Sequence, residues 1–152
     1  MYHLRPATEA DFATIQALIH KVQINPTGLD WSRFVLAVTE QGQIIGCGQV
    51  KPHKDGSLEL ASIAVEPEWR GKGIARAIIE NLISANPNKR LFLTCRTSLQ
   101  SLYERFGFRV SRPEEMTPYF RRLSRIANTV RFLHLLPEGI LVMQREPLTQ
   151  PD

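Results

Sequence analysis

The chain has 152 residues, of which 43% are hydrophobic, and this size and composition predict a single globular domain with a hydrophobic core. No apolar run approaches the roughly 18 residues of a membrane span, and residues 1–5 lack a signal-peptide pattern, so we expect a cytoplasmic protein without membrane contact. The net charge of +4 comes largely from an arginine-rich last third, which lacks a recognised nucleic-acid motif and therefore disfavours nucleic acid as a partner.

The first third of the chain predicts a strand, a helix and a hairpin. Thr8 and Asp11 form a capping-box pattern before the helix, in which apolar residues recur at helical spacing. Trp31 lies on a short second helix before the hairpin, whose strands are joined by a turn at residues 41–42. The expected elements are a strand over 2–5, a helix over 12–22, and strands over 34–38 and 44–50.

The next strand is expected over residues 58–65 and carries an acidic residue among apolar neighbours. Strict alternation places four of its side chains on one face, unless a bulge interrupts the register. These four residues are Glu59, Ala61, Ile63 and Val65.

A strand-to-helix turn at residues 65–75 is the most informative stretch. Gly71 and Gly73 lack Cβ atoms, so the turn can approach an anion closely and adopt conformations that other residues avoid. The following helix offers free N–H groups at the positive end of its dipole, and Arg70 and Lys72 add full charges. The turn therefore predicts a pyrophosphate site, although taken alone it also fits an ordinary basic surface turn. It matches neither the GxxxxGK[ST] nor the GxGxxG nucleotide fingerprint.

A helix over 74–83 and a strand over 91–95 follow, and with the strand over 58–65 they predict a parallel crossover. Ser98 is placed to cap a further helix, and Gly107 suits the C-terminal end of that helix. Four of its residues share one side: Leu99, Leu102, Tyr103 and Phe106.

A basic helical insert over 113–136 separates the last two strands. Thr117-Pro118 has the pattern of a helix start, and apolar residues then recur at helical spacing with arginines between them. We expect the insert either to cover a ligand pocket or to form a dimer face, which leaves monomer and homodimer open. The last strand covers 140–145, so the domain spans 1–146 and is followed by a disordered tail over 147–152.

The two cysteines predict no redox or metal chemistry. Cys47 lies in a glycine-flanked apolar strand and Cys95 ends another strand, with no CxxC pattern and no histidine cluster nearby. Each is best interpreted as a small buried core residue rather than an acyl carrier. We therefore expect no disulfide and no bound metal.

Two motifs, in this order, resemble the GNAT superfamily of acetyl-CoA-dependent N-acyltransferases. The first satisfies every position of the family's cofactor signature: Arg70, Gly71, Lys72, Gly73, Ile74 and Ala75. The second places Tyr103 four residues before a Gly107-Phe108 pair. The resemblance implies an α/β fold with a mixed, mostly antiparallel sheet flanked by helices. It also implies that the strands over 58–65 and 91–95 splay apart to grip pantetheine.

The resemblance also implies site residues. Acetyl-CoA would bind through the pyrophosphate turn and through the backbone of Ile63, Ala64 and Val65, with no metal required. Glu59 occupies the position where several members carry a general base, and desolvation is the condition under which a glutamate acts as one at neutral pH. A solvated glutamate at a strand edge fits the sequence equally. Tyr103 matches the usual general acid, although a tyrosine on an apolar helix face can also belong to the core.

One position departs from the family pattern, because Arg96 stands where many relatives carry an asparagine. Arg96 is either a contact to coenzyme or acidic acceptor, or a surface residue. The function implied is transfer of an acetyl group to a primary amine by direct attack in a ternary complex, with the acceptor unidentified. The alternative is a non-catalytic acyl-CoA sensor that binds a partner through the insert.

Overall fold

The computed structural model describes residues 1–148 and contains seven strands there. They are β1 (Tyr2–Pro6), β2 (Phe34–Thr39), β3 (Ile44–Pro52), β4 (Leu58–Val65), β5 (Leu91–Arg96), β6 (Arg109–Val110) and β7 (Ile140–Arg145). They form one sheet in the order β1-β2-β3-β4-β5-β7-β6. β4 and β5 pair in parallel, whereas β1–β2, β2–β3, β5–β7 and β6–β7 are antiparallel. The predicted mixed, mostly antiparallel sheet is confirmed.

The described residues group into two compact units, which are treated separately below. The first unit combines Met1–Lys51 with Leu60–Asn86, and the second combines Pro52–Glu59 with the chain from Pro87 onward. β4 therefore begins in the second unit and ends in the first.

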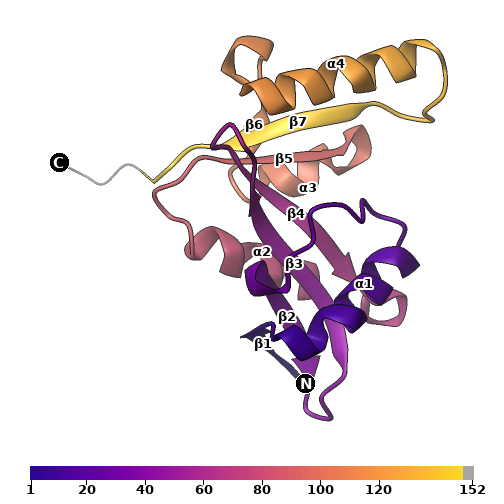
Figure 1. The fold of residues 1–152 in the computed structure, drawn as a ribbon, viewed down its shortest axis with the longest axis vertical. Coiled ribbons are helices and arrows are strands. Elements are labelled where there is room, and N and C mark those ends of the chain that lie inside the picture. The colour runs from indigo at the N-terminus through magenta and orange to yellow at the C-terminus, as the bar shows by residue number, and fades with distance from the viewer. Residues whose placement is uncertain (149–152) are drawn as a thin grey trace. The chain divides into compact units, whose positions relative to one another are not determined.

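The first unit contains helices α1 (Phe12–Lys21) and α2 (Ile74–Ser84). α1 follows a short 3-10 turn in which the Thr8 N–H donates to Asp11 Oδ2 (2.7 Å), so the predicted cap contact is present. Figure 1 shows α1 lying over β2 and β3, and apolar residues fill the space between these elements. The buried cluster comprises Ala7, Ile15, Leu18, Ile19, Phe34, Leu36, Val38, Cys47 and Ala64.

Two glycines of β3 let α2 pack directly against this strand. A Cβ atom on Gly46 would lie 2.9 Å from the Ile74 Cγ2 atom, and one on Gly48 would lie 2.6 Å from the Ile78 Cγ2 atom. Real Cβ atoms do not approach other atoms this closely. The absence of side chains on β3 therefore fixes where α2 lies and, with it, where the turn before α2 lies.

The second unit contains helices α3 (Gln100–Glu104) and α4 (Pro118–Phe132). α4 begins at the predicted Thr117-Pro118 start, and Figure 1 shows it running alongside β7. Its first turns bury Phe120 against Phe92, with ring centroids 4.7 Å apart. Met116 and Val142 complete this core cluster.

Two predictions for the second unit are wrong. Ser98 caps no helix, because a 3-10 turn over Thr97–Leu99 precedes α3 and the Ser98 N–H donates to Glu138 Oε2 instead (3.0 Å). The proposed apolar side of α3 is only partly covered, since Leu99 and Leu102 are exposed. A five-residue helix is too short to present a full apolar stripe.

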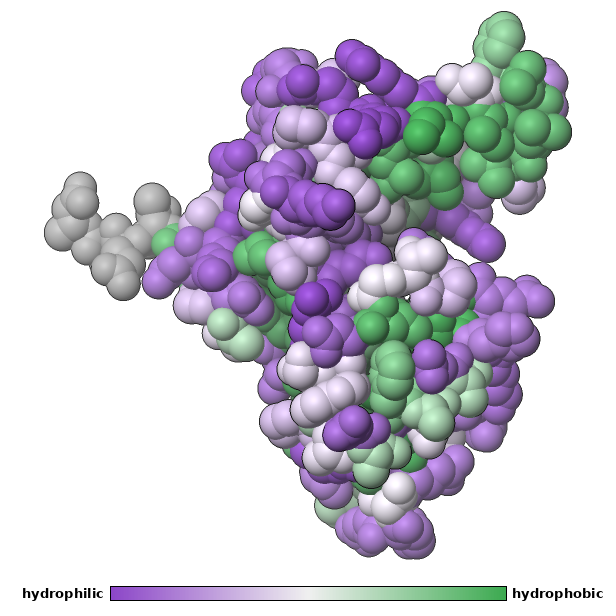
Figure 2. Space-filling model, viewed as in Figure 1, coloured by the Kyte–Doolittle hydropathy of each residue, from purple (hydrophilic) through white to green (hydrophobic). Residues whose placement is uncertain are grey.

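The end of the insert carries exposed hydrophobic side chains. Phe132 is 81% exposed, and Ile126, Leu133 and Leu135 are also exposed. Figure 2 shows hydrophobic surface gathered at this end of α4. The predicted apolar side of α4 is thus buried in its first turns and exposed in its last ones.

The predicted tail lies mostly outside the described residues, since 149–152 are not described. Of the part that is described, the Leu148 N–H donates to the Pro87 carbonyl (2.9 Å).

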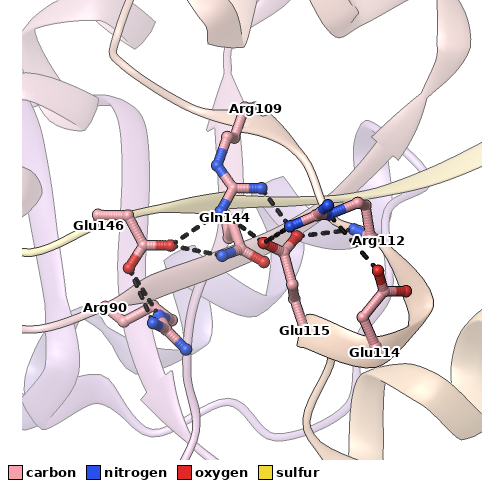
Figure 3. Close-up of polar contacts among 7 residues, drawn as sticks. All are labelled: Arg90, Arg109, Arg112, Glu114, Glu115, Gln144 and Glu146. Carbon is pink, nitrogen blue, oxygen red and sulfur yellow. Dashed lines mark hydrogen bonds and ion pairs between the residues drawn. The ribbon is translucent and has the colours of Figure 1, made fainter.

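An ion-pair network neutralises part of the arginine-rich last third. Glu115 forms ion pairs with Arg109 (2.8 Å) and Arg112 (3.2 Å), and Glu146 forms one with Arg90 (2.9 Å), as drawn in Figure 3. Hydrogen bonds from Arg109 are the main reason that the pKa of Glu115 lies well below its usual range. These arginines act as structural partners of carboxylates, so a count of basic residues overstates the charge available to an anionic ligand.

Candidate functional site

The turn that joins β4 to α2 has the geometry of an anion-binding turn. Gly71 and Gly73 both adopt left-handed backbone conformations, with φ of 76° and 79°. A Cβ atom built on either glycine would meet no atom within 4 Å, so the turn is open on that side. Left-handed conformations favour glycine, which explains why the sequence carries two here.

Positive charge surrounds this turn. The Ala77 N–H donates to the Gly73 carbonyl (3.0 Å), so the N–H groups of residues 74–76 precede the helical ladder and point out of the helix start. Lys72 and Arg70 are exposed beside them. The Lys72 ammonium lies 4.8 Å from the Trp69 ring centroid, and Arg70 Nε donates to the Val65 carbonyl (3.4 Å). The turn therefore fits a pyrophosphate group.

β4 contains the bulge that would interrupt strict alternation. Ser62 has a left-handed φ of 59°, and Ala61, Ser62 and Ile63 are all half-buried in succession. The predicted common face of Glu59, Ala61, Ile63 and Val65 is therefore not kept. Ser62 Oγ accepts a hydrogen bond from Gln49 Nε2 (2.9 Å), which ties the bulge to β3.

The bulge lies directly before the predicted pantetheine-binding residues. Ile63, Ala64 and Val65 form the last segment of β4 in the first unit, together with the turn at Arg70–Ala75. Gln49 and Ser62, which join β3 to this part of β4, were not singled out from the sequence. The sequence signal that could have identified them is a glutamine and a serine within otherwise apolar strands.

Glu59 is buried rather than solvated. Only 7% of the residue is exposed, so the interpretation as a solvated edge glutamate is wrong. Glu59 Oε2 lies 2.7 Å from His53 Nε2, and the His53 ring stacks on Tyr119 of α4. His53 and Tyr119 were not singled out from the sequence, because neither lies near Glu59 in any local motif.

Tyr103 lies on α3 and is kept protonated by its surroundings. Burial, with a smaller contribution from Cys95, raises the pKa of Tyr103 to about 12. Its ring packs edge-on against Phe108 (6.2 Å between centroids), and the Phe108 N–H donates to the Tyr103 carbonyl (3.3 Å). Tyr103 can therefore donate a hydrogen bond at neutral pH.

Glu59 and Tyr103 both belong to the second unit but lie near opposite ends of β5 in the chain. Glu59 pairs with Phe92 near the start of β5, whereas Tyr103 follows the end of β5 at Arg96. Four strand residues correspond to roughly 13 Å along β5.

The remaining candidates have structural surroundings. Cys47 and Cys95 are buried free thiols, and burial raises their pKa values to about 12 and about 11. Arg96 is exposed at the end of β5 and contributes to lowering the pKa of Glu138. Among the residues that the structure describes, no cluster of His, Cys, Asp and Glu could hold a metal ion. Within the same part of the chain, no helix is long and apolar enough to cross a membrane.

Comparison with known families agrees with this geometry. Residues 30–110 match the family model of the acetyltransferase (GNAT) domain. The chain therefore belongs to the GNAT acetyltransferases, as the two sequence motifs predicted.

Individual relatives share the fold and part of the sequence. The chain is 34% identical over 143 residues to the N-acetylaspartate synthetase of Danio rerio, and the match covers 87% of the chain and 48% of that protein. N-acetylglutamate synthase from Neisseria gonorrhoeae, solved with coenzyme A and L-arginine, superposes with a TM-score of 0.71 at 20% identity, over 97% of the chain and 34% of that protein. A Mycobacterium tuberculosis protein solved with CoA superposes with a TM-score of 0.70 at 21% identity, over 96% of the chain and 99% of that protein. The chain thus spans about half the length of the synthetase and a third of the synthase.

Proposed function

We propose that the protein is an N-acetyltransferase that uses acetyl-CoA and a primary amine in a ternary complex, without a covalent enzyme intermediate. The observation that carries this proposal is the open, left-handed Gly71–Gly73 turn at the positively charged start of α2. Acetyl-CoA supplies an activated acyl group when it is bound. The turn over Arg70–Ala75 would hold its pyrophosphate, and the backbone of residues 63–65 would hold the pantetheine amides.

The two candidate catalytic residues would act on opposite sides of the transfer. Glu59 would accept the proton that the amine loses as it attacks, directly or through water. The Val65 N–H would polarise the acyl carbonyl. Tyr103 would donate a hydrogen bond to the departing sulfur, and full proton transfer is not needed because a phenol is a weaker acid than a thiol.

We infer that the acceptor is an α-amino acid. The names of two similar proteins, N-acetylaspartate synthetase and N-acetylglutamate synthase, support this class. The basic surface of the insert, where Arg122 and Arg125 are exposed, is compatible with an acceptor that carries carboxylates. We further propose that residues 1–146 act as one catalytic domain in the cytoplasm.

Calorimetric titration with acetyl-CoA tests the coenzyme site. Gly73→Asp should abolish binding, because it places an anion where the pyrophosphate should lie. Gly73→Ala adds the same backbone strain without the charge and should weaken binding less. Gly56→Asp is the matched control, since Gly56 has a φ of 85° and equally open surroundings but lies at the other end of β4. Equal binding by Gly73→Asp and the parent chain would refute the assigned site.

An acceptor screen then tests the reaction. We expect release of free CoA thiol when the protein is given acetyl-CoA and an amino acid from a panel that includes aspartate, glutamate and their amides. Acetyl-CoA binding without turnover of any amine would instead favour the alternative, a non-catalytic acyl-CoA sensor.

A further inference from the structure

We propose that His53 is a positioning residue for Glu59 and that the insert helix α4 holds His53 in place. The inference rests on the proposed role of Glu59 as the proton acceptor. It assigns a task to the insert that separates β6 from β7.

The contact between His53 and Glu59 is close and buried. His53 Nε2 and Glu59 Oε2 lie 2.7 Å apart, and the two side chains are 12% and 9% exposed. When the carboxylate is ionised it can only accept hydrogen bonds, so the contact then requires Nε2 to donate. A buried carboxylate is costly without such a donor. His53 thus supplies one of the interactions that stabilise the Glu59 carboxylate at this place in the sheet.

Two aromatic rings of α4 fix the imidazole. Tyr119 stacks on His53 with ring centroids 3.6 Å apart and an interplanar angle of 18°. Phe120 meets the same imidazole edge-on at 5.5 Å and 86°. With one face covered and one edge blocked, the His53 ring has little freedom to rotate away from Glu59.

The start of α4 is itself fastened to the turn that carries His53. The Tyr119 N–H donates to Asp55 Oδ2 (2.9 Å), which joins residues 64 positions apart in the chain. Asp55 also accepts from the Ser57 N–H (3.0 Å), so the turn between β3 and β4 is ordered by the same carboxylate. The insert and the turn therefore form one assembly around the imidazole.

This assembly bears on catalysis because a proton acceptor works only in a narrow range of positions. A hydrogen bond to Oε2 fixes the plane of the Glu59 carboxylate, and misplacement by about 1 Å can cost a reaction roughly a hundredfold in rate. A short hairpin loop in place of α4 would provide no ring against His53. The positioning role thus depends on the insert.

Steady-state kinetics with an acceptor found in the screen tests the proposal. His53→Leu removes the donor and should lower kcat by about tenfold to a hundredfold, with the affinity for acetyl-CoA unchanged. His53→Gln keeps an Nε2 donor and should retain most of the rate. Tyr119→Ala should resemble His53→Leu, whereas Tyr119→Phe keeps the stacked ring and should resemble the parent chain.

The same substitution made in a Glu59→Gln variant distinguishes a failure of this inference from a failure of the proposed function. In Glu59→Gln, the further change His53→Leu should cost little, because residues that act through one another are not additive. Additive losses, or full activity in His53→Leu, would overturn the positioning role. Full activity in Glu59→Gln alone would instead refute Glu59 as the base.

A spectroscopic readout needs no turnover. Nitrogen-detected NMR of the imidazole should show a protonated, hydrogen-bonded Nε2 in the parent chain and in Tyr119→Phe, and loss of this signature in Tyr119→Ala. Melting curves show whether each variant is folded. An unchanged Nε2 signal in folded Tyr119→Ala would overturn the role of α4, and an unprotonated Nε2 in the parent chain would overturn the contact itself.

Discussion

Tyr103 illustrates how burial suits a residue to donate a hydrogen bond. Its phenol is a poor acid in water, and burial in the second unit makes it poorer by raising its pKa to about 12. A group of this kind does not lose its proton in the physiological range. In the proposed reaction it is therefore a constant donor rather than a titrating acid.

Tyr103→Phe should lower kcat by about a hundredfold and leave the affinity for acetyl-CoA within about twofold of the parent value. The ring and its contact with Phe108 are kept, so only the hydroxyl is lost. Rate measurements between pH 6 and pH 9 provide the check. The parent chain should show no loss of activity from Tyr103 ionisation there, and an undiminished kcat in the variant would remove Tyr103 from the reaction.

Glu115 predicts a pH dependence of stability. Its carboxylate is stabilised in the folded state by Arg109 and Arg112, so its folded pKa lies below the ordinary value of 4.5. A depressed pKa contributes stability that is present above the ordinary value and is lost as the pH falls below it.

Glu115→Gln should therefore lower the melting temperature at pH 7, and the difference from the parent chain should shrink towards pH 3. Thermal melts at both values, in low salt, measure this. Glu114→Gln is the matched control, because the Glu114 side chain is 67% exposed and its contact to Arg112 is longer (3.6 Å). An equal effect of both variants would contradict the special role of Glu115.

At the scale of elements, the contact between β3 and α2 determines the position of the turn at Gly71–Gly73. Gly48→Ala would bring a Cβ atom within 2.6 Å of both Ile63 Cδ1 and Ile78 Cγ2. Overpacking of this kind typically costs about 1–3 kcal/mol. Chemical denaturation should show this loss of stability.

Ile63→Val removes the Cδ1 atom that the new methyl group would meet. The double variant should therefore be less destabilised than the sum of the two single variants. Simple additivity would show that the contact with Ile78 or a backbone shift, rather than the contact with Ile63, sets the cost.

The insert shows how one element can serve several purposes. Its first turns pack Phe120 into the core of the second unit and Tyr119 against His53, while its last turns expose Phe132 and its neighbours. Periodicity predicted that a helix starts at Thr117-Pro118, and the structure agrees. Periodicity does not say which turns of a helix find a partner, so it could not separate the buried end from the exposed one.

At the scale of the whole molecule, most elements and one strand pairing were predictable, whereas the burial of the helices was not. The bounds of β4 agree with the sequence, and the parallel pairing of β4 with β5 followed from the crossover pattern. The short α3 was overestimated, because Leu99 and Leu102 keep helical spacing without being covered. The spacing of apolar residues shows which side of a segment can be buried. Whether that side is buried depends on which other elements pack against it.

The sequence by itself determined the family. It also predicted the turn that we propose binds the coenzyme, because glycines, charges and a helix start act within a few residues of one another. Only the tertiary structure decided the environment of Glu59. His53 contacts that carboxylate from the turn between β3 and β4, and Tyr119 of α4 stacks on His53. The hydrogen bond that joins α4 to this turn spans 64 residues. Such contacts form only when the sheet and the insert pack together. Residue patterns that are local in the chain therefore cannot encode them.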